Sequence, residues 1–80
     1  MKIHILLFGI ATDLLNTSSL ELEVSENCTV AVFKKEIRAT YPPLENINSY
    51  AIAVNEAYAS DETILKSNDV VAIIPPVSGG

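Results

Sequence analysis

Residues 70–80 read VVAIIPPVSGG, and this stretch joins an apolar run to a stiff end of small residues. Residues 70–74 predict a buried strand, because a short continuous apolar run that follows polar turn residues is typical of one. Pro75 and Pro76 end this strand, since proline has no N–H for the ladder and holds φ at about −65°. The sequence therefore predicts a globular domain over residues 1–74 and an extended tail over residues 75–80.

The composition of the tail suits a segment that enters another protein. Extended backbone advances about 3.1 Å per residue, so the tail would reach roughly 20 Å from the sheet. Gly79 and Gly80 have no side chains, so we expect a flexible Gly-Gly end with a free carboxylate. A frayed terminus is the alternative, because glycine and serine are common at disordered chain ends. The diproline argues against fraying, but the tail alone leaves both interpretations open.

The composition of the chain limits its class and its partners. Its 80 residues suffice for one small domain, and 49% hydrophobic with 19% charged residues predicts a globular fold rather than disorder. The net charge of −5 disfavours nucleic acid and membrane as partners, since both are bound through clustered Lys and Arg. Lys34, Lys35 and Arg38 form a basic cluster that we interpret as the solvated face of a helix. An acidic chain suits a partner with a basic surface.

The body of the domain offers little catalytic chemistry. It has no P-loop, GxGxxG or CxxC motif, and its one histidine, His4, supports neither a metal site nor a catalytic triad. His4 is interpreted as a surface strand residue, and we expect no metal and no bound cofactor. Cys28 precedes an expected helix, where a thiol pKa can fall, but a small apolar filler is the preferred interpretation. Two acidic pairs are interpreted as solubilising charges: Glu21/Glu23 and Asp61/Glu62.

The single cysteine and the apolar start bear on the compartment. One cysteine allows no intramolecular disulfide, which fits a reducing environment. Residues 1–8 are apolar but too short for a membrane span, and they show no convincing cleavage site. We therefore expect a cytoplasmic protein.

Alternating apolar residues predict two strands in the first third of the chain. Residues 2–8 place Ile3, Ile5 and Leu7 on one side and mostly apolar residues on the other, which is typical of a central strand. Residues 10–15 fit a short helical turn that stops at Asn16. Residues 19–25 alternate apolar residues with Glu21 and Glu23, as expected near a sheet edge after a hairpin.

The rest of the chain predicts one main helix and three further strands. Thr29 is a good N-cap, and apolar positions recur at helical spacing from residue 30 to about 41, where Pro42 and Pro43 follow. Residues 44–49 are expected to form a loop. Strands are expected at residues 50–54, 57–59 and 70–74, with a turn at Asn55-Glu56 and polar turns at residues 60–63 and 66–69.

These elements predict an α+β fold, a mixed sheet of four or five strands packed on one main helix. A single helix covers only one face of such a sheet, so outward apolar residues of the first and last strands would form an exposed patch. Leu6 and Phe8 are the candidates for a partner-binding surface. The phase of Val70, Ala72 and Ile74 is less clearly set by the pattern.

The order of elements and the ending DVVAIIPPVSGG, residues 69–80, resemble the ubiquitin-like sulfur carriers, in particular the small subunit of molybdopterin synthase. The closing Pro-Pro-Val-Ser-Gly-Gly is its most specific part, and the likeness spans the chain, including Phe8 at the end of the first strand and the turn at Ala53-Val54-Asn55. The resemblance implies the ubiquitin-like β-grasp fold. This chain has Asn68-Asp69 where the family usually has Gly-Asp, and Thr12 where many relatives carry arginine. Asn also tolerates positive φ, so the turn before the last strand is expected to survive.

The resemblance also implies a role for the tail. An E1-like adenylating and sulfurating enzyme would use ATP to convert the Gly80 carboxylate to an acyl-adenylate, and a sulfur donor would then leave a thiocarboxylate. The tail residues Pro75, Pro76, Val77, Ser78 and Gly79 would insert into the large subunit of a heterotetrameric synthase. That subunit would supply the catalytic residues, while the thiocarboxylate donates sulfur to a cyclic pterin precursor to form the dithiolene of molybdopterin.

Three rival functions stay open. The chain would serve as a sulfur carrier for the thiazole of thiamine, since those relatives also end in Gly-Gly, although the Pro-Pro-Val-Ser sequence favours the pterin pathway. It would alternatively be a ubiquitin-like modifier that is joined to lysines through Gly80. The third possibility is an interaction domain with an inert tail.

Overall fold

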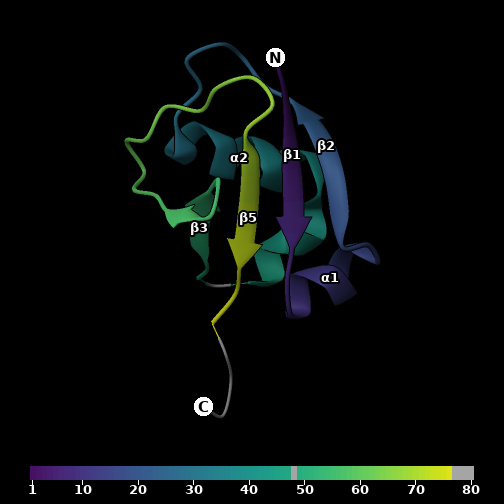
Figure 1. Cartoon of the computed structure of the whole chain (residues 1–80). Coiled ribbons are helices and arrows are strands. Elements are labelled where there is room, and N and C mark those ends of the chain that lie inside the picture. Colours follow the sequence, from purple (N-terminus) through teal and green to yellow (C-terminus); the bar gives the residue numbers. More distant parts are fainter. Residues whose placement is uncertain (48, 77–80) are drawn as a thin grey trace.

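The computed structural model describes residues 1–47 and 49–76, which form a mixed sheet with helices on one side and at one end (Figure 1). In chain order, the elements of the described residues are β1 Lys2–Leu7, α1 Ile10–Leu15, β2 Ser19–Glu23, α2 Val30–Thr40, the 3₁₀ helix η1 Pro42–Asn46, β3 Ala51–Val54, β4 Ala57–Tyr58 and β5 Val70–Ile74.

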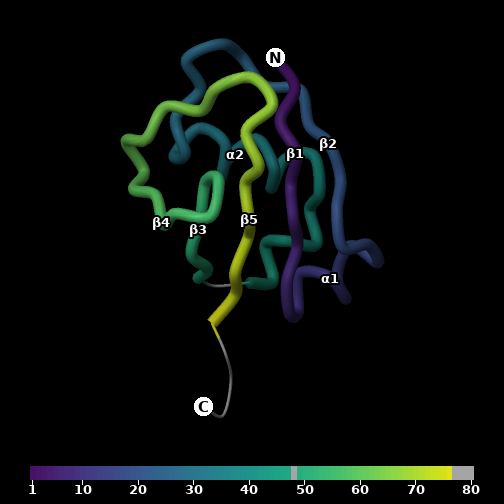
Figure 2. The backbone as a smooth tube through the Cα atoms, viewed as in Figure 1, coloured from purple at the N-terminus to yellow at the C-terminus, as the bar shows by residue number. Residues whose placement is uncertain are grey.

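The five strands of the described residues lie in the order β2-β1-β5-β3-β4 (Figure 2). β1 and β5, the first and last strands, are parallel neighbours in the middle of the sheet, and the other pairs are antiparallel. The predicted central first strand and the edge position of β2 are confirmed. This arrangement is the α+β, ubiquitin-like β-grasp fold implied by the resemblance.

The main helix α2 lies behind the sheet and supplies one side of the core (Figure 1). Its N-cap Thr29 accepts a hydrogen bond from Val32 N at 3.3 Å, as the sequence predicts. Val30, Phe33 and Ile37 are fully buried along one stripe. They face the inward residues of the sheet, which include Ile3, Ile5, Leu7, Ile52, Val71 and Ile73.

The segment after α2 differs from the prediction. Residues 44–49 were expected to form a loop, but Pro42–Asn46 form the 3₁₀ helix η1. The two prolines cause the difference, because their fixed φ suits the first turn of a helix and their missing N–H groups are unpaired there in any case. Leu44, which is buried, packs into the core and holds the turn in place.

The turns use asparagine where the backbone enters the left-handed region. Asn55 and Glu56 have φ of 50° and 73° between β3 and β4, which confirms the predicted tight turn. Asn68 has φ of 68° before β5, so this asparagine adopts the left-handed geometry expected for the turn. Asn16, with φ of 56°, ends α1 as expected.

In the part of the chain that the structure describes, each helix is too short or too polar to cross a membrane.

Candidate partner-binding face and tail exit

The sheet face that α2 leaves uncovered carries the candidate surface. Strand alternation buries Ile3, Ile5 and Leu7 and turns Leu6 outward, where 37% of its surface is exposed. Phe8 follows directly after β1 and is 48% exposed. Both predicted surface residues therefore lie on the open face of the domain.

The strand register sets one continuous row of residues across this face. Leu6 pairs with Ser19 on β2 and with Ala72 on β5, Ala72 pairs with Ala53 on β3, and Ala53 pairs with Tyr58 on β4. Directly paired residues point to the same side of a sheet, so the row places Leu6 and Tyr58 at the two sides of a strip of small alanines. The small alanine side chains therefore leave the middle of the face hollow, and the larger side chains of Leu6 and Tyr58 stand out on either side of it.

This relief forms a shallow groove of about 330 Å³ with a mainly apolar lining. The groove is lined by Leu6, Phe8, Ala53, Glu56, Tyr58, Val70, Ala72 and Ile74. The structure thus settles the phase of the last strand: Val70, Ala72 and Ile74 face outward, while Val71 and Ile73 are buried. A contiguous apolar hollow on a small domain is typical of a protein-binding surface.

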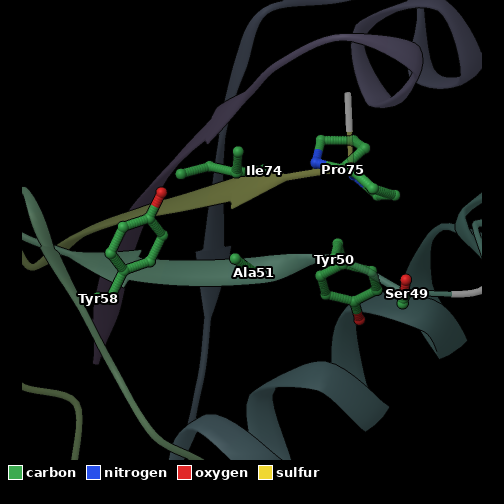
Figure 3. Close-up of a pocket in the computed structure, with 7 residues that line it drawn as sticks. Ser49, Tyr50, Ala51, Tyr58, Ile74 and Pro75 are labelled. Atoms are coloured by element: carbon green, nitrogen blue, oxygen red, sulfur yellow. The ribbon is translucent and has the colours of Figure 1, made fainter. Parts of the chain in front are cut away.

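Tyr58 is the groove residue that the sequence analysis missed. It was assigned only to a short return strand, yet 78% of its surface is exposed, the largest fraction among the exposed large hydrophobic residues described. In Figure 3 its ring extends from β4 across β3 with the hydroxyl toward Ile74. A sequence signal for this exposure was available, because Tyr58 is an aromatic residue two positions after a tight turn and would pair with an alanine.

A second hollow, of about 450 Å³, lies where the chain leaves the sheet after β5 (Figure 3). Its lining combines the start of β3 with the base of the tail: Ser49, Tyr50, Ala51, Tyr58, Ile74, Pro75 and Pro76. Tyr58 and Ile74 border both hollows, so the groove lies directly beside the tail exit. Pro75 is buried and Pro76 is exposed. The other predicted tail residues, Val77, Ser78, Gly79 and Gly80, lie outside the described residues.

The opposite end of the open face is charged. Glu21 on β2 contacts Lys2 Nζ at 3.7 Å and His4 Nδ1 at 3.3 Å on β1, and Glu23 contacts the Met1 amino group at 3.3 Å. His4 is a partly exposed strand residue, as predicted. These charged side chains are paired with one another across β1 and β2. The apolar groove at the other end of the face is therefore the candidate site.

Three comparisons place this architecture among known proteins. The model of the ThiS family matches residues 5–80 of the chain. The chain belongs to the ThiS family. Curated relatives of this family member include proteins named molybdopterin synthase sulfur carrier subunit. The one from Arabidopsis thaliana is 36% identical over 100% of this chain and 84% of its own length. The one from Mycobacterium tuberculosis is 32% identical over 100% of this chain and 99% of its own.

Solved structures support the β-grasp fold of this ThiS-family chain. A putative molybdopterin converting factor subunit 1 from Pyrococcus furiosus has a TM-score of 0.86 at 27% identity, covering 96% of this chain and 99% of its own. SAMP1 from Haloferax volcanii has a TM-score of 0.89 at 20% identity, with complete coverage of both chains. A chain in the complex of subunits 1 and 2 of the Helicobacter pylori molybdopterin-converting factor has a TM-score of 0.72 at 23% identity, covering both chains fully. The latter two likenesses concern the fold alone.

Two polar residues of this ThiS-family chain serve structural roles. Thr12 Oγ1 donates a hydrogen bond to Leu7 O at 3.0 Å, which ties α1 to the end of β1. Lys34 lies on the solvent side of α2, as expected, and its Nζ lies 2.8 Å from Asp61 Oδ1 and 5.8 Å from the centroid of the Tyr50 ring. The pair fastens α2 to the loop before β5 and to the start of β3.

Cys28 is a core residue in this ThiS-family chain. It is 4% exposed and packs in the hydrophobic cluster. Burial raises the pKa of the Cys28 thiol, and the nearby Glu36 carboxylate raises it further. The thiol is therefore kept neutral, and the filler interpretation is confirmed. Within residues 1–47 and 49–76, no three potential metal ligands are close enough to hold an ion.

Proposed function

We propose that this chain is the sulfur carrier subunit of a molybdopterin synthase, with the Gly80 carboxylate as the group that carries the sulfur. The observation that supports this most directly is that the apolar groove lies beside the tail exit and shares Tyr58 and Ile74 with it. A partner that covers the groove is in position to receive whatever the tail delivers. The full-length similarity to sulfur carrier subunits from several kingdoms supports the same function.

The proposed chemistry begins with activation of the terminal carboxylate. A carboxylate is a poor electrophile, so an E1-like enzyme joins it to the AMP of ATP and releases pyrophosphate. A sulfur donor then attacks the acyl carbon, AMP leaves, and the carrier retains a thiocarboxylate. The thiocarboxylate sulfur is the nucleophile toward the cyclic pterin precursor, so activation and use of the group occur on different proteins.

The body of the domain acts as the recognition element in this scheme. Leu6, Phe8 and Tyr58 provide the apolar contact area for the large subunit, and Glu56 at the groove lining adds a negative charge that suits a basic partner surface. The ATP belongs to the activating enzyme. The large subunit supplies the catalytic residues, and this chain supplies the sulfur.

The proposal is tested by intact mass of the protein purified from its native host, with and without alkylation. A sulfur carrier shows the mass increase for exchange of one oxygen by sulfur and is alkylated at that sulfur. Deletion of Gly80 is expected to abolish sulfur transfer to the pterin precursor and to leave the circular dichroism spectrum unchanged. The matched control is Glu62→Ala, which lies outside the tail and keeps the terminal glycines. Normal transfer by a chain that ends at Gly79 contradicts the proposal.

A sulfur carrier for the thiazole of thiamine is the second candidate. The family model that matches residues 5–80 is the ThiS model, and a Gly-Gly end serves both pathways. The names of the curated relatives favour the pterin pathway. Purification of the tagged chain from its host separates the two, because each pathway supplies a different acceptor protein. Adducts on lysines of other proteins would instead indicate a protein modifier.

A further inference from the structure

We propose that Pro75 is a positioning residue, which docks on the domain and fixes the direction in which the tail leaves it. This inference rests on the proposed function, since it concerns how the Gly80 carboxylate is aimed at an acceptor. It adds that the two prolines have different roles. Pro75 belongs to the folded body, whereas Pro76 is exposed.

The turn after β1 forms one side of the Pro75 site. Gly9 has φ of 54° and ψ of −132°, a combination that L-residues rarely adopt, and it brings the backbone close to the proline ring. A Cβ on Gly9 would lie 3.9 Å from Pro75 Cγ, which is ordinary van der Waals contact. The turn is held in place because Thr12 N donates to Gly9 O at 3.1 Å and Thr12 Oγ1 donates to Leu7 O.

The start of β3 forms the other side. Ser49 and Tyr50 line the hollow together with Pro75, and Figure 3 shows them along the same end of the sheet. Tyr50 is itself held, since Lys34 lies over its ring and is paired with Asp61. Pro75 therefore lies beside the turn at Gly9 and borders the same hollow as the segment just before β3, and both of these segments are restrained.

The contrast between the prolines carries the inference. Pro75 is buried while Pro76, one residue later, is exposed. A proline that is both docked and fixed in φ has almost no backbone freedom, so the next residue leaves the domain from a set point. This restraint lowers the entropy lost when the tail enters an acceptor, because fewer dihedrals remain to be ordered. Replacing Pro75 removes the docking and the φ restraint, whereas replacing Pro76 removes the φ restraint alone.

The first experiment measures tail direction without any enzyme. Nitroxide labels are placed at Lys35→Cys on α2 and at Ser78→Cys in a Cys28→Ala background of the full chain, and the distance distribution is measured by pulsed electron resonance. Pro75→Ala is expected to broaden the distribution and shift its mean, while Pro76→Ala leaves the mean in place. Equal distributions in the two variants, or no change in Pro75→Ala, overturn the inference.

The second experiment measures delivery in the reconstituted synthase. Pro75→Ala is expected to lower kcat/KM for sulfur transfer about tenfold, the factor for ordering roughly one more backbone residue, and Pro76→Ala much less. The kcat at saturating large subunit should be unchanged, because the acceptor then holds the tail. A loss in kcat alone, or equal losses in both variants, overturns the positioning role. Absence of thiocarboxylate in the unmodified chain would instead refute the proposed function, and the label distances would still test the docking.

A third measurement covers the case in which Pro75→Ala fails to fold. In the unmodified, isotope-labelled chain, nuclear Overhauser contacts are expected from the Pro75 ring to Gly9 Hα. A set of contacts from Gly9 that omits Pro75 overturns the inference whatever the variants do.

Discussion

Asn55 and Asp69, fourteen residues apart, are joined by a hydrogen bond from Asn55 Nδ2 to Asp69 Oδ1 at 2.9 Å. Asn55 Oδ1 also accepts from Val70 N at 2.9 Å, and Asn55 N donates to Val70 O at 2.8 Å. One asparagine therefore shapes the β3–β4 turn and holds the start of β5 against it. Glu56 and Val70, which line the groove, flank this contact.

Replacing Asn55 tests this double role. Asn55→Ala is expected to lower the free energy of unfolding by about 2–3 kcal/mol, because it removes two side-chain hydrogen bonds and places a Cβ residue without local compensation at positive φ. Asn55→Gly removes the same bonds but tolerates the φ of 50°, so its loss should be smaller by roughly 1 kcal/mol. Urea unfolding measures both. Equal losses would show that the backbone conformation contributes nothing.

Glu56 offers a substitution that should stabilise the domain. Its φ of 73° lies in the region that glycine adopts freely, and Asn-Gly is the preferred pair for a two-residue hairpin turn. Glu56→Gly is expected to raise the free energy of unfolding by about 0.5–1 kcal/mol through relief of this strain. Thermal unfolding at neutral pH provides the measurement, with Glu62→Gly in a polar turn as the control. A lower melting temperature for Glu56→Gly than for the control contradicts the interpretation.

Tyr58 is expected to be a binding hot spot for the large subunit. Its ring is 78% exposed in the free domain and borders both the groove and the tail exit, so a partner there would bury it. Tyr58→Ala should weaken the complex at least about tenfold, as truncation of a buried interface aromatic commonly does, with little change in stability. Calorimetric titration measures the affinity.

The control for Tyr58 is Ile64→Ala. Ile64 is also apolar and 53% exposed, but it bridges to Thr29 beside α2 and is absent from the groove lining. Its truncation should leave affinity within about twofold, as expected for a residue outside an interface. If both variants bind equally well, the groove is not the contact surface.

The buried thiol of Cys28 predicts a pH dependence of stability. Its pKa is raised above the ordinary value of 9.0, so the folded state holds the proton more tightly than the unfolded chain. The stabilisation is complete below pH 9.0 and falls as the pH rises from there through the folded-state pKa. Urea unfolding across this range should show a steeper loss for the unmodified chain than for Cys28→Ala. Parallel pH profiles would contradict the assignment.

A substitution at Gly79 tests whether the partner proteins leave room for a side chain next to the end of the tail. Gly79→Val adds a branched side chain next to the terminal carboxylate, which is the reacting group under the proposed function. The variant is expected to block either acyl-adenylate formation or tail insertion, since close approach of other backbones needs a residue without Cβ. Pyrophosphate release with the activating enzyme reports the first step, and sulfur transfer reports the second. Val77→Ala is the control farther from the carboxylate. Unimpaired activation and transfer by Gly79→Val would contradict the role of the terminal glycines.

Local patterns predicted most of the secondary structure. Strand β5 has the predicted bounds, α2 begins after Thr29 as expected, and the Asn55-Glu56 turn has positive φ at both residues. Each of these predictions depends on residues close together in the sequence, such as a helix cap or the alternation of apolar and polar side chains along a strand. The prediction of a loop after α2 was wrong because two consecutive prolines permit a 3₁₀ helix as readily as an irregular loop. Only the burial of Leu44 decides between the two.

The candidate site divides in the same way. Leu6 and Phe8 were predicted because alternation along one strand reveals an outward apolar residue. The exposure of Tyr58 in the groove was missed, and so was the difference in burial between Pro75 and Pro76. Each depends on which segments, distant in the sequence, lie next to the residue in the fold. The pairing of Ala53 with Tyr58 and the position of the Gly9 turn beside Pro75 relate residues that no local pattern connects.

The sequence by itself determined the positions of the strands and of α1 and α2, and the outward side of β1, because backbone preferences and side-chain alternation are local properties. The tertiary structure decided that β1 and β5 are parallel neighbours, that their outer faces and Tyr58 share one groove, and that Pro75 is buried beside the neighbouring hollow. Those outcomes depend on burying the inner faces of all strands against α2 at once. That burial depends on contacts across the whole chain, so a pattern that spans only five or six residues does not predict it.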